Sequence, residues 1–240
     1  MKAIILAAGR GERMRPLTDH TPKPLLPVHG RPLIEWHVLA LARAGVREIV
    51  VNTAWLEQQI VAALGDGARF GVAIRYSMEG RGFGAALETA GGIATALPLL
   101  TERADDPFWV VSGDIHVPAF DFDTPAVVRF TDGDALAHLW LVPNPPFHAK
   151  GDFGFATAPG TPGNCLLTEG PGHDGLSHTY ANLALCRAGL VEAIAPGTRA
   201  ALGPRLFDAA RGGRLTGELY HGTWENVGTP SQLQALNRGL

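Results

Sequence analysis

Short apolar runs alternate with longer amphipathic segments through the first half of the chain. Residues 3–8 are all apolar and end at Gly9, a pattern typical of a strand buried on both faces of a parallel sheet. From Pro32 to Ala44 apolar residues recur every three or four positions, and Gly45 follows. This spacing predicts a helix with proline at its first position and glycine just beyond its end.

The same alternation continues up to the middle of the chain. Further strands are predicted at 48–52, 72–76 and 108–112, and further helices at 56–64 and 89–97. Strands that alternate with helices form right-handed βαβ units. We therefore predict an α/β fold: a Rossmann-like, open, mainly parallel twisted sheet with helices on both faces.

Beyond Asp114 the pattern becomes less regular. Strands are predicted at 136–142, 153–155, 165–168 and 179–186, and a final helix with Thr229 as N-cap and Pro230 as its first residue. The short strands among turns predict antiparallel additions to the sheet. The domain prediction is a single unit over 1–240, with a first half at 1–114, a lobe at 115–228 and a C-terminal helix at 229–240.

Composition narrows the classes of protein. The chain has 240 residues, of which 46% are hydrophobic and 18% charged, which excludes a disordered or fibrous protein. The net charge of −3 and the absence of a long basic run argue against nucleic acid or a membrane surface as partner. Two cysteines without a CxxC pair predict no disulfide framework, and the first apolar run is too short for a signal peptide or membrane span. We expect a cytoplasmic protein that is a monomer or a small homo-oligomer.

A long loop after the first strand carries the candidate chemistry. Residues 9–31 show no helical or strand period, where a compact α/β unit normally uses about 2–6 residues. Gly9 and Gly11 let backbone N–H groups approach an anion, and Arg13 and Lys23 supply positive charge, so phosphate is the expected ligand. Neither the GxGxxG nor the GxxxxGK[ST] spacing is present. A glycine-rich turn with solvated arginines is the alternative.

Two further features favour a ligand site. Prolines on both sides of Lys23 stiffen the backbone around it, which a solvated surface lysine does not need. The apolar run FWVVSGD ends in Asp114 at the expected carboxyl end of a strand, where a carboxylate can hold Mg²⁺ against a triphosphate. A turn-capping role for Asp114 is the alternative.

The run GxGxRxxPLTxxxPKPLLPV, from Gly9 onward, resembles the signature of sugar-1-phosphate nucleotidylyltransferases, a resemblance that extends over essentially the whole chain. It implies that Arg13 and Lys23 act on the phosphates and that Asp114 is a metal ligand, so these three are the expected catalytic residues. The nucleotide-binding residues that it implies are Ala8, Gly9, Gly11, Glu12, Arg13, Lys23, Glu79, Thr89, Gly91 and Ser112.

The resemblance also covers the remaining motifs. In LETAGGI, Thr89 is a plausible N-cap, and Gly91 with Gly92 can let a flat base lie against the backbone. The implied sugar-phosphate contacts are Gly151, Asp152 and Asn182, for which a local turn role is equally open. In WENVGT, Asn226 stands where many relatives have an aspartate as second metal ligand. Its carbonyl oxygen can still bind Mg²⁺ but without the charge, unless Glu225 compensates.

The implied activity is Mg²⁺-dependent transfer of a nucleotidyl group to a sugar 1-phosphate with release of pyrophosphate. Within the family, the compact length and the patterns ETAGGI, KGDFGF and ENVGT are most similar to enzymes that use UTP and N-acetylmuramate α-1-phosphate in peptidoglycan recycling. Mannose-1-phosphate guanylyl transfer and glucose-1-phosphate uridylyl or thymidylyl transfer are alternatives. A catalytically inactive regulator that binds a nucleotide sugar is an alternative of another class.

Overall fold

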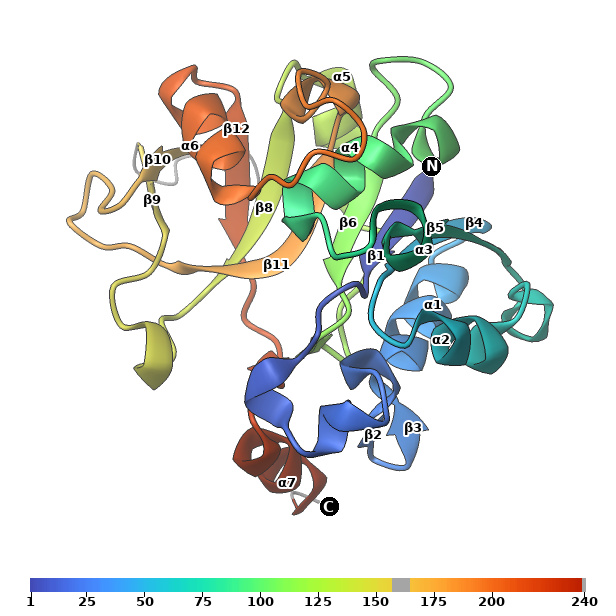
Figure 1. Cartoon of the computed structure of the whole chain (residues 1–240). Coiled ribbons are helices and arrows are strands. Elements are labelled where there is room, and N and C mark those ends of the chain that lie inside the picture. Colours follow the sequence, from blue (N-terminus) through green and yellow to red (C-terminus); the bar gives the residue numbers. More distant parts are fainter. Residues whose placement is uncertain (157–164, 239–240) are drawn as a thin grey trace.

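A sheet of nine strands runs through the computed structural model, which describes residues 1–156 and 165–238 (Figure 1). The strand order is β5-β4-β1-β6-β11-β8-β12-β10-β9. The strands are β1 (Lys2–Leu6), β4 (Glu48–Thr53), β5 (Ala73–Met78), β6 (Phe108–Ser112), β8 (Ala137–Val142), β9 (Phe153–Phe155), β10 (Cys165–Glu169), β11 (Thr179–Cys186) and β12 (Leu215–Leu219). Two ribbons pair β2 (Pro27–Val28) with β3 (Arg31–Pro32) and β7 (Ile115–His116) with β13 (Glu225–Asn226).

The first half of the sheet is parallel. Ile4 in β1 lies between Val50 of β4 and Val110 of β6, and β5 extends the same parallel arrangement beyond β4. The chain therefore moves outward from β1 to β5 and then returns to the other side of β1. This reversal makes a topological switch point at the carboxyl ends of β1 and β6, where open α/β sheets bind ligands.

The second half of the sheet is mixed. β11 runs antiparallel to β6 and β8, and β10 runs antiparallel to β12 and β9, as the predicted antiparallel additions require. β12 was not predicted, and it pairs parallel to β8. Its sequence LTGEL contains glycine and glutamate, so its strand character comes from its place between β8 and β10.

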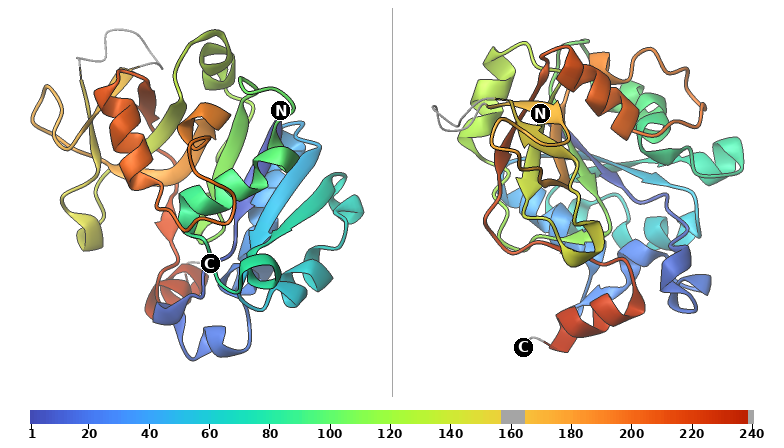
Figure 2. Two further views of the ribbon diagram at one scale, coloured as in Figure 1. Left: turned by 45° about the horizontal axis from the view of Figure 1, so that its top comes forward. Right: turned by 90° about the vertical axis from the view of Figure 1, so that its left-hand side faces the viewer.

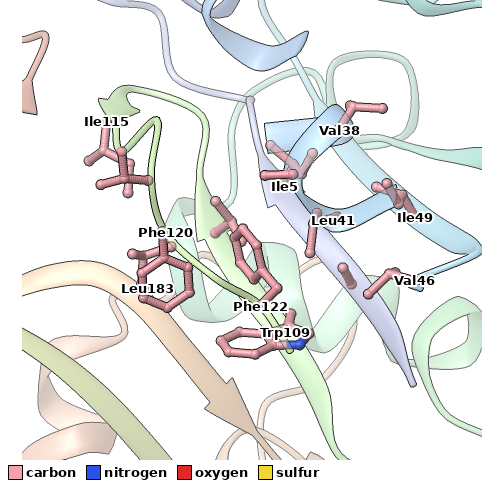
Figure 3. Packing of buried hydrophobic residues seen from close by; sticks show 14 of the residues in the cluster. Ile5, Val38, Leu41, Val46, Ile49, Trp109, Ile115, Phe120, Phe122 and Leu183 are labelled. Carbon is pink, nitrogen blue, oxygen red and sulfur yellow. The ribbon is translucent and has the colours of Figure 1, made fainter. Parts of the chain in front are cut away.

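Helices cover both faces of the sheet (Figure 2). They are α1 (Leu33–Arg43), α2 (Glu57–Leu64), α3 (Glu79–Phe83), α4 (Glu88–Leu100), α5 (Pro125–Asp132), α6 (Gly203–Arg211) and α7 (Pro230–Arg238). Successive strand residues point to opposite faces, so Ile5 packs with Val38 and Leu41 of α1 (Figure 3), whereas Ile4 packs with Ile93 of α4. The continuous apolar run of β1 follows from burial on both faces.

Three helices begin one residue away from the predicted position, and one of them is α2, which begins at Glu57 and not at residue 56. α1 begins at Leu33, because Pro32 pairs with Pro27 in the small ribbon. α4 begins at Glu88, so Thr89 is not its N-cap. The first-turn N–H groups of Ala90 and Gly91 instead donate to the carbonyl oxygen of Ala200, at 2.9 and 3.1 Å, from a distant loop. α3, α5 and α6 were not predicted.

The C-terminal helix braces the loop that follows β1. Thr229 is the N-cap as predicted, because its hydroxyl accepts a hydrogen bond from the Gln232 N–H at 3.3 Å. Asn237 accepts a hydrogen bond from the N–H of His29 at 2.7 Å. Both views show α7 beside this loop (Figures 1 and 2). The last two residues of the predicted 229–240 segment lie outside the described residues.

None of the helices in the described part of the chain combines the length and the apolar composition needed to cross a bilayer.

Candidate active site

The sheet topology brings four segments to one edge. β1, β6, β8 and β12 all run in the same direction, because β8 and β6 are both antiparallel to β11 and β12 is parallel to β8. The segments that follow these strands therefore start at one edge of the sheet. They contain the glycine loop, Asp114, the loop 143–152 and the segment with Asn226.

The glycine loop is folded onto itself. Three single-turn 3₁₀ helices occupy Glu12–Met14, Leu17–Asp19 and Lys23–Leu25, although the sequence showed no period there. Gly11 has a φ of 67°, and its carbonyl oxygen accepts a hydrogen bond from the Thr18 hydroxyl at 2.8 Å. Hydrogen bonds within the loop therefore hold its shape, which reduces the entropy lost when a ligand binds.

The arginines of this loop have different surroundings. Arg10 lies over the ring of Trp55, with its guanidinium carbon 3.6 Å from the ring centroid, and its Nη2 is 3.1 Å from Asp19. Arg15 donates from Nε to the same carboxylate at 2.8 Å. Arg13 is exposed and lines the two cavities of the site. Arg10 and Arg15 hold the loop together, and Arg13 faces the site.

Lys23 points at the carboxyl end of β6. Its ammonium lies 2.9 Å from Oδ2 of Asp114, and the residue is only 8% exposed. Pro22, at φ −58° and ψ 138°, leads an extended backbone into the turn that starts at Lys23. Residues 91 positions apart thus form a buried cation beside a carboxylate, as a phosphate and metal site requires.

A small cavity of about 320 Å³ surrounds this pair. Its lining is Gly9, Gly11, Glu12, Arg13, Met14, Lys23, Asp114 and Gly228. Six of the predicted nucleotide-binding or catalytic residues are thereby brought together. The cavity combines three glycines with two cations, which suits a group rich in phosphate oxygens.

A larger cavity of about 530 Å³ adjoins the small one. Its lining is Arg13, Thr89, Phe147, His148, Asp152, Phe153, Thr179, Tyr180, Asn182, Ala201, Leu202, Gly203, Leu206, Phe207, Trp224 and Asn226. The cavities meet at Gly228, where an added Cβ would lie 3.7 Å from both Arg13 Nη2 and Asn226 Oδ1. Apolar walls with a few convergent polar groups are typical of a small-molecule site.

Asn226 presents an oxygen without a partner. Its Oδ1 is buried and makes no hydrogen bond to the described residues. β13 holds Asn226 opposite Ile115, and the next N–H, of Val227, donates to the carbonyl oxygen of Asp114 at 2.9 Å. Glu225 lines a different cavity, because successive strand residues point to opposite sides. Glu225 therefore does not supply the charge that Asn226 lacks.

Asn182 lies at a bulge of β11. Its φ is 60°, and the register between β11 and β8 shifts between Tyr180 and Ala184. A bulge of this kind redirects a side chain next to a site, and Asn182 lines the larger cavity as expected for a sugar contact.

Of the predicted sugar-phosphate contacts Gly151 and Asp152, only Asp152 lines the larger cavity. However, its Oδ1 is 2.9 Å from His148 Nε2 and its Oδ2 accepts the N–H of Tyr180 at 2.9 Å. Gly151, at φ 63°, lies against Asn144 and outside the cavity lining. Both residues shape the loop, and His148, which the sequence analysis missed, faces the cavity. The four-residue spacing from His148 to Asp152 in a proline-rich loop was the available signal.

Glu79, a predicted nucleotide-binding residue, is buried and hydrogen-bonded within the protein. It has no exposed surface, and its oxygens accept hydrogen bonds from Asn52 Nδ2 at 2.6 Å and from the Leu87 N–H at 2.7 Å. Burial raises the pKa of this carboxyl above its ordinary value. Asn52 also accepts the Ala7 N–H at 2.8 Å. This network, whose Asn52 was missed, joins the glycine loop to the start of α4.

Three other predicted nucleotide contacts lie behind the cavities. A Cβ on Gly91 would collide with the carbonyl oxygen of Thr198, so this side of the glycine is packed against the chain. A Cβ on Gly92 would likewise collide with the side chains of Asn52 and Glu79. Ser112 and Ala8 lie outside both linings, at the ends of β6 and β1. Thr89 does line the larger cavity.

The fold and the cation-lined cavity together indicate the class of protein. The chain belongs to the nucleotidyl transferase family, which matches residues 2–239. It is therefore a nucleotidyltransferase, of a family that transfers nucleotidyl groups from nucleoside triphosphates to sugar 1-phosphates and generally uses a divalent metal.

Particular relatives refine this assignment. The chain is 47% identical to N-acetylmuramate alpha-1-phosphate uridylyltransferase from Neisseria meningitidis serogroup B, over 98% of this chain and 96% of the relative. It is 29% identical to glucose-1-phosphate thymidylyltransferase from Streptomyces griseus, over 99% of this chain and 65% of that protein. The crystal structure of a putative glucose-1-phosphate thymidylyltransferase from Bacillus anthracis superposes with a TM-score of 0.80, at 24% identity, over 99% of this chain and 94% of that one. The predicted fold class and family are confirmed.

Proposed function

We propose that this protein transfers the uridylyl group of UTP to N-acetylmuramate α-1-phosphate, giving a UDP-sugar and pyrophosphate for peptidoglycan recycling. Its similarity to the Neisseria enzyme over nearly the full length of both chains supports the substrates. The observation that carries the chemistry is the convergence of Arg13, Lys23 and Asp114 on one small cavity beside a larger one.

The reaction needs charge neutralisation more than acid–base chemistry. A phosphate oxygen of the sugar 1-phosphate attacks the α-phosphorus of UTP, a new P–O bond forms, and the bond to the departing pyrophosphate breaks. The nucleophile is already an anion, so no general base is required. In this proposal Arg13 and Lys23 offset the negative charge that builds up on the phosphates, and the folded glycine loop positions them.

We propose Mg²⁺ as the divalent metal. Asp114 offers a carboxylate and Asn226 a buried amide oxygen without a partner, and both are oxygen ligands that fit a hard cation. Bound there, the ion would neutralise phosphate charge and polarise the attacked phosphate. Among the described residues no cluster of three or more His, Cys, Asp or Glu side chains could hold a metal. Substrate oxygens and water would complete the coordination.

The two cavities suggest how the substrates divide. In this proposal, Gly9, Gly11 and Glu12 lie along the triphosphate in the small cavity, and Thr89 lies on the nucleotide side of the larger one. Asn182 contacts the sugar. The protein acts in the cytoplasm, and its two thiols, Cys165 and Cys186, are free as a reducing compartment requires.

A substrate panel tests the proposal. UTP, GTP, dTTP and ATP are each combined with the 1-phosphates of N-acetylmuramate, N-acetylglucosamine, mannose and glucose, and pyrophosphate release is measured with Mg²⁺. UTP with N-acetylmuramate 1-phosphate is expected to have the highest kcat/KM. A preference for GTP with mannose 1-phosphate, or for dTTP with glucose 1-phosphate, would assign a different transferase. Tight binding of a UDP-sugar without turnover by any pair would favour the regulator that the missing charge at Asn226 suggests.

A further inference from the structure

The proposed acceptor differs from other amino-sugar 1-phosphates by one charge. N-acetylmuramate carries a lactyl ether that ends in a carboxylate, which N-acetylglucosamine lacks. A site that selects this acceptor needs a cation or N–H donors for the extra carboxylate, because a desolvated and unpaired charge opposes binding. The inference below rests on the proposed function and concerns how that carboxylate is recognised.

The larger cavity offers few positive groups. Among the described residues that line it, the side chains able to carry positive charge are Arg13 and His148. Arg13 also lines the phosphate cavity, and its Nη2 lies beside Gly228 where the two cavities meet. The phosphates of UTP and the sugar 1-phosphate would occupy that guanidinium. His148 is the other side chain of this lining that can carry a positive charge toward a second anionic group.

The surroundings of His148 hold its ring in one orientation. His148 ends the 3₁₀ turn Pro146–His148, in the loop between β8 and β9. Its Nε2 lies 2.9 Å from Oδ1 of Asp152, whose other oxygen is bound to the N–H of Tyr180 on β11. The backbone N–H of Asp152 donates to the carbonyl oxygen of His178 at 2.8 Å. Asp152 is thus anchored to the sheet and fixes the ring through Nε2.

This arrangement leaves Nδ1 of His148 for a ligand. The side chain is 40% exposed, so a ligand group can reach it from the cavity. The protonated ring carries N–H groups on both nitrogens, so it can donate to Asp152 and to a carboxylate at the same time. We propose that His148, oriented by Asp152, binds the lactyl carboxylate of N-acetylmuramate 1-phosphate and so determines acceptor specificity.

The test compares two acceptors in one variant. His148→Gln keeps a side chain that can donate to Asp152 but removes the positive charge. Steady-state kinetics are measured with UTP and either N-acetylmuramate 1-phosphate or N-acetylglucosamine 1-phosphate. We expect kcat/KM for the muramate acceptor to fall about tenfold or more, mainly through KM, and that for the glucosamine acceptor to change less than about threefold. A third acceptor is N-acetylmuramate 1-phosphate whose lactyl carboxylate has been converted to a neutral amide. With this acceptor, the loss of kcat/KM in His148→Gln should again be less than about threefold.

His221→Gln is the control variant. It changes an exposed histidine of a neighbouring cavity and should leave kcat and KM for both acceptors unchanged. An equal loss with both acceptors, or no loss with either, would overturn the role of His148 while leaving the proposed function intact. Wild-type protein that uses N-acetylglucosamine 1-phosphate but not N-acetylmuramate 1-phosphate would overturn both.

Discussion

Arg13 and Arg15 lie two residues apart in the glycine loop, and packing separates their roles. Arg15 is tied to Asp19, whereas Arg13 faces both cavities. Arg13→Gln should lower kcat about 10²-fold, because a fixed positive charge aimed at the reacting phosphates is lost. Arg15→Gln should stay within about threefold, since Asp19 keeps its contact with Arg10. The rate of pyrophosphate release gives kcat for both variants. Equal losses of kcat would contradict the separate roles of Arg13 and Arg15.

The proposed metal site permits a comparison between the neighbouring residues Asn226 and Glu225. Asn226→Asp restores a negative charge beside Asp114, so the Mg²⁺ concentration for half-maximal activity should fall severalfold. Glu225→Gln should leave it unchanged, because Glu225 lines another cavity. Mn²⁺ binding followed by electron paramagnetic resonance gives a readout independent of turnover. A higher metal requirement in Glu225→Gln would show that Glu225 does compensate.

Single residues were predicted well where chemistry was local. Lys23 was singled out because its flanking prolines are visible in the sequence, and its burial beside Asp114 agrees. The burial of Glu79 was not predicted, because it depends on Asn52 and Leu87, which contact it only in the folded chain. The sequence contains no sign of which remote group satisfies a buried carboxylate.

At the scale of elements, α4 depends on a segment far along the chain. Gly91 packs against the backbone of Thr198, and the first N–H groups of the helix donate to Ala200. Gly91→Ala should lower the free energy of unfolding by about 1–3 kcal/mol, because the added Cβ must displace a carbonyl group. Gly82→Ala is the control, since a Cβ there meets nothing within 4 Å.

Urea denaturation measures both glycine variants. If Gly91→Ala kept wild-type stability but raised KM for UTP, the base-contact interpretation of this glycine would return.

An amphipathic pattern and a local cap did not by themselves make a helix predictable. The predicted helix from Thr229 was found, with its hydroxyl cap. α5 begins with a Thr124 cap and Pro125, and α6 buries Leu206 and Ala209 on one face, but neither was predicted, because both lie where the regular alternation of strands and helices has ended. Contacts with β10 and β12 hold α6 in place.

At the scale of the whole molecule, two buried histidines join separate elements. His37 in α1 bonds the carbonyl oxygen of Ile115 through Nε2 at 2.9 Å, and His138 in β8 bonds the hydroxyl of Thr216 at 2.9 Å. Desolvation lowers the pKa of His37 to about 4 and that of His138 to about 3, below the ordinary 6.5. Both rings are therefore neutral in the folded protein at neutral pH.

Because these histidines are neutral in the folded protein, we expect the folded protein to lose stability as the pH falls. The unfolded chain binds protons near pH 6.5 while the folded chain does so only near pH 4 and 3, so stability present above pH 6.5 is lost as the pH falls. Between pH 6.5 and 5 the two together should lower the free energy of unfolding by about 3 kcal/mol. Urea denaturation across this range measures it. Burial also lowers the pKa of His116 to about 4, so this third histidine adds a comparable loss over the same range. His37→Gln should therefore flatten the slope by about a third and exposed His221→Gln should not, whereas a flat wild-type profile would contradict the account.

The sequence by itself determined the alternation of strands and helices in the first half, and it identified the glycine loop, Arg13, Lys23 and Asp114 as the candidate site. These depend on residues within a few positions of one another, where periodicity, proline and glycine act directly. Only the tertiary structure decided that Lys23 contacts Asp114, that Glu225 lines a different cavity from Asn226, and that Asp152 is bonded to the ring of His148. Burial and hydrogen-bond pairing arise when remote segments pack together, and no local pattern encodes which partners meet.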